Sequence, residues 1–566
     1  MIDLKGNPYY LDDTQQEWVA ETLSSMTDDE KLEQLFCPLA FTNDPDALRG
    51  MLSKYKFGGL MFRPGDAAST QAGLNAVQES ARIPLFLAAN LEDGGNGIAE
   101  TEGTYMGRQM LISATNDTNK AYELGKICGR EGSAVGINWT FAPVVDIDNN
   151  FRNPITNVRT YGAEADQVLA MGRSYMKGAN EEGMMVSIKH FPGDGVDDLD
   201  QHLATSVNSL TLDEWEATYG KIYRGLIADG AQAVMVGHIA MPAMEEYFDQ
   251  KPCTTMIPAT ASSNIVNGYL RGVLGFNGLI ITDASPMVGL LSATTRKSSV
   301  PGAIAAGCDM FLFSKDLDED IQFMKDGFRE GIITRERLDE AVTRILATKA
   351  ALGLPEMKAG GKLVKTAADL AVLQCEEHLD WARECADMGV TMVKDTQKLL
   401  PLDSKKYPRV LMEILGDFPS NDRVYAQFEA LLTKEGFQVE KYVPETFETI
   451  FNDSRVADFK NKYDLVIYIG NIENASNKTT ARINWHTLFG AGNNIPWFVK
   501  EVPTMFISVG NPYHLYDVPM ISTFVNGYCH SPYVIDAVVE KIMGRSVFKG
   551  VSPVDAFCGK EYLKFS

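Results

Sequence analysis

The sequence predicts an α/β protein with an N-terminal (β/α)8-type TIM barrel, followed by a smaller three-layer αβα sandwich domain. Three observations support this prediction. Short apolar runs, typical of buried strands, alternate with segments of helical periodicity along residues 1–352. A glycine-rich segment then interrupts the alternation, and a second set of strands and helices follows it. Eight strand and helix units favour a closed parallel barrel, whereas the later five favour an open sheet with helices on both faces.

The elements of the barrel can be placed in order. A capping box between Thr27 and Glu30 predicts a helix that begins just before the periodic KLEQLF segment. Further helical patterns cover 117–132, 163–182 and 334–352. We expect the eight barrel strands at 36–41, 58–62, 84–89, 141–145, 184–188, 233–237, 279–282 and 309–313.

The predicted boundaries give a catalytic barrel at 1–352, a linker with a helical connection at 353–390, and the sandwich at 391–566. The linker is a basic, glycine-rich segment from Leu354 to Lys362. The sandwich strands are expected at 410–415, 437–443, 465–470, 503–510 and 520–525.

Composition excludes several classes of function. With 75 acidic and 52 basic residues, the formal net charge is −23, which disfavours nucleic acid and anionic membranes as partners. No apolar run is long enough to span a bilayer, and the first residues lack the pattern of a signal peptide, so we expect no membrane association. Eight cysteines are scattered without the spacing of metal or redox motifs. They indicate reduced thiols and a cytoplasmic protein.

The densest cluster of polar residues is SIKHFPGDGVDDLDQH, at 187–202. Its first residues end a predicted strand, and glycines then place the acidic part on a loop. Within it, Asp200 precedes His202 by two residues, so the carboxylate can hold one ring nitrogen while the other moves a proton. Two other interpretations stay open, namely a solvated acidic loop and a metal site built from His190, His202 and the aspartates.

Other predicted strands also end in polar residues. The third is followed by Glu92 and Asp93, the fourth by Asp146 and Asp148, the sixth by His238, and the seventh ends in Asp283. Alone, Asp283 could be a helix N-cap. Because the carboxyl ends of barrel strands share one face, together these groups predict a site there.

The motifs resemble glycoside hydrolase family 3, and within it the β-N-acetylglucosaminidase branch in its two-domain form. The resemblance covers most of residues 30–350, with weaker likeness beyond. The segments that carry it are Lys189-His190-Phe191-Pro192-Gly193 followed by Asp200-Gln201-His202, Ile281-Thr282-Asp283 with Met287, Phe141 to Asp146, Arg159 to Gly162, Met235 to His238, and Leu270 to Phe276.

The resemblance implies a retaining exo-acting β-N-acetylglucosaminidase that needs no cofactor and no metal. Asp283 would form a covalent glycosyl-enzyme, and His202, oriented by Asp200, would be the acid and then the base. The substrate would be a small carbohydrate with a terminal β-linked N-acetylglucosamine. The sugar-binding residues would be Lys189, His190, Arg159, Asp194, His238 and Glu92, with Asp93 as the alternative to Glu92.

Two departures from the family pattern affect the expected sugar specificity rather than the class of reaction. Asp194 stands where KHFPGHG has a second histidine, and Ala284 replaces a second aspartate. An alternative is therefore a β-glucosidase or related exo-glycosidase with Glu473, from the second domain, as acid and base. Other possibilities are transfer to phosphate instead of water, and a non-catalytic carbohydrate-binding protein on the same scaffold.

Overall fold

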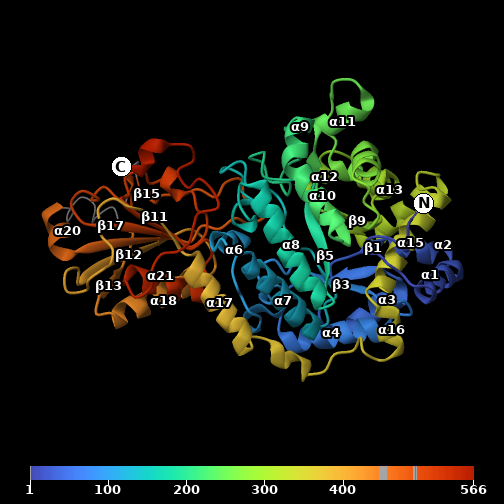
Figure 1. Ribbon diagram of the computed structural model, residues 1–566, viewed down its shortest axis with the longest axis horizontal. Coiled ribbons are helices and arrows are strands. Elements are labelled where there is room, and N and C mark those ends of the chain that lie inside the picture. The colour runs from blue at the N-terminus through green and yellow to red at the C-terminus, as the bar shows by residue number, and fades with distance from the viewer. Residues whose placement is uncertain (1, 445–455, 489–490, 493, 566) are drawn as a thin grey trace.

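The computed structural model describes residues 2–444, 456–488, 491–492 and 494–565. The chain forms two parts that lie side by side, the first coloured blue to yellow and the second orange to red (Figure 1). An eight-stranded parallel sheet organises the first part, and a six-stranded mixed sheet organises the second. The predicted fold class, a barrel followed by an αβα sandwich, is confirmed.

The first sheet forms a barrel whose strands follow one another around it in chain order. Its two ends meet at a parallel bridge between Leu39 and Met61, where the Ala40 N–H donates to the Met61 carbonyl over 2.8 Å. Both faces of the sheet are covered, which explains the continuous apolar runs. The strands are β1 (Phe36–Cys37), β2 (Gly59–Met61), β3 (Phe86–Ala89), β4 (Trp139–Thr140), β5 (Met185–Phe191), β7 (Ala233–Val236), β9 (Leu279–Ala284) and β10 (Met310–Leu312).

Two strands differ from the prediction near the site. β4 ends at Thr140, whereas the sequence predicted a strand at 141–145. Pro143 has no N–H to donate to a neighbouring strand, so beyond Thr140 the contact with β5 is reduced to a bridge between Val144 and Lys189 and a hydrogen bond from the Ser187 N–H to the Ala142 carbonyl. β5 is longer than predicted and continues to Phe191, which puts Lys189 and His190 on the strand itself.

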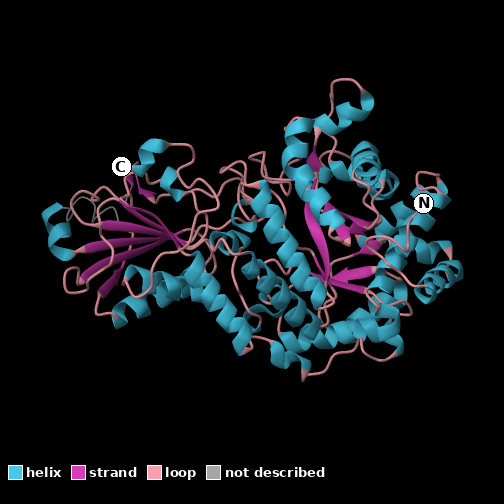
Figure 2. Cartoon of the chain, in the orientation of Figure 1, coloured by secondary structure: helices cyan, strands magenta, loops and turns pink. Residues whose placement is uncertain are grey.

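Helices form a layer around the barrel strands (Figure 2). The capping box is confirmed, because Thr27 and Glu30 each bind the other's backbone N–H at the start of α2. The three longer helical patterns correspond to α7, α8 and α15. The principal helices are α1 (Asp13–Ser25), α2 (Asp28–Gln34), α3 (Pro45–Lys54), α4 (Ala67–Ser80), α6 (Gln109–Ala114), α7 (Thr118–Val135), α8 (Ala165–Glu181), α10 (Lys221–Ala228), α11 (Pro242–Asp249), α13 (Arg296–Ala306), α14 (Leu317–Arg329) and α15 (Arg335–Ala351).

The connection between the two parts is more ordered than a glycine-rich linker. A short helix, α16 (Leu354–Ala359), occupies most of the segment predicted as linker. Pro355 suits its first turn, where a backbone N–H would have no helical partner. The helix α17 (Glu376–Gly389) then leads into the second sheet. We retain 352 and 391 as proposed domain boundaries.

The second sheet has the strand order β11-β18-β17-β14-β12-β13. Five strands match the predicted ones, and β11 is an additional edge strand that runs antiparallel to β18. Alternate residues of β12 face opposite ways: Val410 and Met412 join the main core, while Leu411 joins a second apolar cluster. The elements are β11 (Thr391–Asp395), β12 (Arg409–Leu415), α18 (Asn421–Lys434), β13 (Gln438–Lys441), α20 (Val456–Lys462), β14 (Leu465–Gly470), β17 (Thr504–Ser508), β18 (Thr523–Asn526) and α21 (Pro532–Ile542).

Among the described residues, we find no helix of the length and apolar character that crossing a lipid bilayer requires.

Candidate active site

The predicted polar residues meet at the carboxyl ends of the barrel strands. Lys189 and His190, at the end of β5, lie between a group that follows β3, a group that follows β4 and a group near the end of β9. The ion pairs and hydrogen bonds described below join these strand ends across the barrel. Residues separated by up to 191 positions in the chain, Glu92 and Asp283, therefore belong to one cluster.

Asp283 lies near the end of β9 with only 14% of its side chain exposed. Its Oδ2 is 4.0 Å from Nε2 of His190, and its Oδ1 accepts a hydrogen bond of 2.7 Å from the Ala284 N–H. Burial alone would raise the pKa of Asp283, but the neighbouring imidazoles of His190, His238 and His202 outweigh burial and hold the pKa below its ordinary value. Asp283 is therefore ionised at neutral pH, as a nucleophile must be.

Asp146, which follows β4, orients His190 through the ring nitrogen that is farther from Asp283. Nδ1 of the ring lies 2.7 Å from Asp146 Oδ2, and the backbone N–H groups of His190 and Asp194 donate to Asp146 Oδ1. Because Nδ1 is held by a carboxylate, Nε2 is left to face Asp283. The sequence placed Asp146 at a strand end but did not predict this role.

Glu92, after β3, is clamped by two cations. Arg159 donates to it in a bidentate arrangement with distances of 2.8 and 2.9 Å, and Lys189 Nζ lies 2.7 Å from Oε1. Burial would raise the pKa of Glu92, but the charges of Arg159 and Lys189 hold it well below the ordinary value. Glu92 is thus the carboxylate that lies with the predicted sugar-binding cations.

Asp93 points to a different partner. Its Oδ2 pairs with Arg108 Nη1 at 2.5 Å, and Nε of the same arginine lies 2.5 Å from Oε1 of Glu473 in the second part. Burial raises the pKa of Asp93 to about 7, although Arg108 lowers it. Sequence reasoning missed Arg108, which belongs to none of the quoted motifs.

His202 and Asp200 form the predicted pair on the loop that follows β5. His202 Nδ1 lies 2.7 Å from Asp200 Oδ1, and the His202 backbone N–H donates to the same oxygen over 2.9 Å. The ring is one quarter exposed, whereas Asp200 is buried. The loop packs against the segment after β9, because the Val288 N–H donates to the His202 carbonyl. Because Asp200 holds Nδ1, Nε2 is the ring nitrogen that this carboxylate leaves for other partners.

His238, which follows β7, and Asp194, on the same loop as the pair, both bond to protein groups. His238 is buried, and its ring nitrogens lie 2.8 Å from Thr260 Oγ1 and 3.0 Å from the Ala284 carbonyl. Burial lowers the pKa of His238, and its Nε2–H donates to the Ala284 carbonyl, which can only accept. Asp194 accepts bonds from Asn153, Gly195 and Gln201. Direct sugar binding by these two residues stays a prediction.

Glu473, the alternative acid and base, is fully buried after β14. Burial would raise its pKa, but Arg108 and His530 hold the pKa below the ordinary value. A carboxyl group that is ionised and paired with arginine is a poor proton donor at neutral pH.

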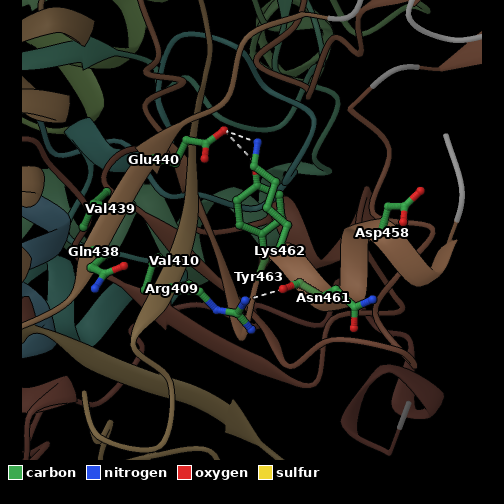
Figure 3. A pocket seen from close by; sticks show the side chains of 9 residues that line it. All are labelled: Arg409, Val410, Gln438, Val439, Glu440, Asp458, Asn461, Lys462 and Tyr463. Atoms are coloured by element: carbon green, nitrogen blue, oxygen red, sulfur yellow. Dashed lines mark hydrogen bonds and ion pairs between the residues drawn. The ribbon is translucent and has the colours of Figure 1, made fainter. Parts of the chain in front are cut away.

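A surface pocket of about 720 Å³ lies in the second part, around β12, β13 and α20 (Figure 3). Among its lining side chains, Glu440 is bonded to Lys462 and to Tyr463. None of the predicted site residues lines it, so this pocket is separate from the cluster at the barrel mouth.

Comparison with known proteins identifies the family of the chain. Residues 27–348 match the family described as "Glycosyl hydrolase family 3 N terminal domain". A Cellulomonas fimi protein named "Beta-N-acetylglucosaminidase/beta-glucosidase" is 44% identical over 99% of both chains. The "Beta-hexosaminidase A" of Pseudoalteromonas piscicida is 26% identical over 70% of this chain and 68% of its own. A solved structure, "Beta-glucoside phosphorylase BglX bound to 2FGlc", has a TM-score of 0.93 and 42% identity, covering 98% of this chain and 99% of its own. The chain therefore belongs to glycosyl hydrolase family 3, whose members act on carbohydrates.

Proposed function

We propose that the protein is an exo-acting, retaining β-N-acetylglucosaminidase that removes terminal non-reducing N-acetylglucosamine. Asp283 attacks the anomeric carbon and forms a covalent glycosyl-enzyme, while His202 Nε2–H protonates the departing oxygen. In the second step the neutral imidazole takes a proton from the incoming water, and Asp283 leaves. Asp200 keeps the ring in the tautomer that carries its mobile proton on Nε2.

The observations that carry the proposal are that His202 is among the imidazoles that lower the pKa of Asp283, and that Asp200 holds Nδ1 of this His202 ring. Glu92, Arg159 and Lys189 supply the charged groups that would hold the hydroxyls of a single terminal sugar. A non-catalytic carbohydrate-binding role would leave the His202 and Asp200 pair without a purpose.

A second candidate function is transfer of glucose from a β-glucoside to phosphate instead of to water. It is favoured by the 42% identity to a protein named as a β-glucoside phosphorylase and by the double name of the Cellulomonas fimi relative. A neutral imidazole repels an incoming anion less than a glutamate base would, so the proposed acid and base suits either acceptor.

A panel of aryl β-glycosides separates these candidates. N-acetylglucosaminide and glucoside are compared with and without phosphate, and the products are analysed for free sugar and sugar 1-phosphate. A preference for the acetamido sugar supports the first candidate, and phosphate-dependent glucosyl phosphate supports the second. Preference for neither sugar would contradict both.

The acid is tested with His202→Ala. We expect kcat/KM to fall by about 10²- to 10⁴-fold on phenyl glycosides and much less on dinitrophenyl glycosides, which need no protonation to depart. Glu473→Ala is the matched control, because it removes the other candidate acid. If Glu473→Ala shows the selective loss and His202→Ala does not, the second-domain glutamate is the acid.

A cytoplasmic location is also proposed, on the ground that all eight cysteines are unpaired thiols.

A further inference from the structure

The acid and base pair is held by both parts of the molecule. Asp200 uses Oδ1 to bind His202, through the ring Nδ1 and the backbone N–H. Its other oxygen, Oδ2, accepts a hydrogen bond of 2.8 Å from the backbone N–H of Asn477, which belongs to the second part of the chain. Asp200 is buried, so this bond fixes the plane of a carboxylate that water does not freely solvate.

A second contact ties the same segments together. Asn474 Nδ2 lies 3.4 Å from the carbonyl of Asn153, and Asn153 Nδ2 donates to Asp194 and to the Asp197 carbonyl on the loop that carries the pair. The segment that follows β14 therefore contacts the catalytic loop both directly and through Asn153.

The neighbouring residue on the loop is held differently. Gln201 Oε1 accepts from the His238 N–H, its amide donates to Asp194, and its carbonyl accepts from the Gly289 N–H. All of these partners belong to the barrel. The barrel thus fixes the backbone beside His202, while the second part binds the carboxylate that orients its ring.

From this difference we propose that Asn477 is a positioning residue for the reaction, and that its backbone N–H sets the orientation of the Asp200 and His202 pair. This inference rests on the proposed function. Without the bond, the Asp200 carboxylate can rotate away from His202 Nδ1, and the imidazole loses the tautomer that presents a proton on Nε2. The second domain then acts on protonation of the leaving group rather than on sugar binding.

The test replaces Asn477 by proline, which has no N–H, and by glycine, which has one. Asn477 has a φ of 68°, a backbone conformation that glycine adopts readily, so Asn477→Gly is the matched control. Proline, whose φ is fixed at about −65°, removes the N–H and also moves this backbone away from Asp200. For Asn477→Pro we expect kcat/KM on phenyl glycosides to fall by about 10- to 100-fold, the loss typical of one hydrogen bond to a buried charge. On dinitrophenyl glycosides we expect little change, and Asn477→Gly should resemble the wild type on both.

Equal losses on the two substrates would overturn the inference, because a merely structural role lowers all activity alike. No loss would overturn it as well. If Asn477→Pro does not fold, as judged by its melting curve, insertion of two glycines before Asn477 displaces the same N–H and gives the same comparison. His202→Ala measured in parallel keeps the two proposals apart, since a selective loss in that variant alone refutes the role of Asn477 and leaves the acid assignment intact.

Discussion

The proposed nucleophile and sugar-binding groups are held by barrel strands, whereas the proposed acid is held by a loop. Asp283 and Lys189 lie on barrel strands, and Glu92 follows one directly, each within a dense set of buried charges. His202 lies on a loop, is more exposed, and depends on an orienting carboxylate that reaches the second domain. The nucleophile must meet one sugar in one geometry, whereas the acid must reach the oxygen of varied leaving groups. Strand-borne and loop-borne groups suit those two demands.

The largest effect is expected at the strand-borne nucleophile. Asp283→Ala should lower kcat/KM by about 10⁴-fold or more on every leaving group, because no covalent intermediate can form. Azide should restore part of the activity by entering the space left by the carboxylate, and its product should have the opposite anomeric configuration. Activity near the wild-type level without azide would exclude Asp283 as nucleophile.

Arg159→Met should lower kcat/KM less than Asp283→Ala does, and again without distinguishing good from poor leaving groups. Removing one partner of a buried ion pair costs about 3–5 kcal/mol and leaves Glu92 with Lys189. kcat/KM should fall by the same factor on phenyl and dinitrophenyl glycosides. Since Arg159 helps to hold the pKa of Glu92 down, that pKa rises in the variant, and the acid limb of the pH profile should move to higher pH. A loss confined to phenyl glycosides would place Arg159 with the acid instead.

Glu473→Gln should have a modest effect, because the amide keeps the shape of the side chain while Arg108 retains Asp93. We expect kcat/KM to fall by less than about tenfold and equally on both leaving groups, together with a lower melting temperature from the weakened interdomain pair. A selective loss on poor leaving groups would assign Glu473 as the acid. The acid would then belong to the second domain and not to the loop that carries His202.

The smallest effect concerns Asp148, whose Oδ2 accepts from the Tyr513 hydroxyl of the second domain over 2.6 Å. Burial raises the pKa of Asp148 to about 7. The folded state therefore binds a proton that the unfolded state has already lost, so wild-type stability declines as pH rises from about 4 through 7. Asp148→Asn removes that decline. The melting temperature of the variant should therefore rise relative to that of the wild type as pH rises from 5 to about 8. An unchanged difference would mean that Asp148 does not titrate in this range.

The sequence predicted the parallel strands of both sheets well because buried parallel strands are continuous apolar runs, as in the segments that form β5 and β9 of the barrel and β14 of the second sheet. It missed β11, an edge strand that carries Lys394 and Asp395 and lacks such a run. It also misplaced β4, where Pro143 limits pairing although the surrounding residues are apolar.

The site was predictable where a motif keeps its residues together, as in the segment from Lys189 to His202. Arg108 and Asn477 were not predictable in this way. Arg108 acts through carboxylates at Asp93 and Glu473, far apart in the chain, and Asn477 acts through its backbone N–H, which every residue except proline has. Contacts between domains of this kind leave no local pattern in a sequence.

In the proposed reaction, the carboxylate of Asp283 becomes covalently attached to the sugar. The direct measurement is mass spectrometry of peptides after reaction with a fluorinated, activated glycoside that forms the intermediate quickly and releases it slowly. We expect a single added glycosyl unit on the peptide that contains Asp283, and none in Asp283→Ala. A label on Asp200, on Glu473 or on any other residue, or turnover without a label, would contradict it.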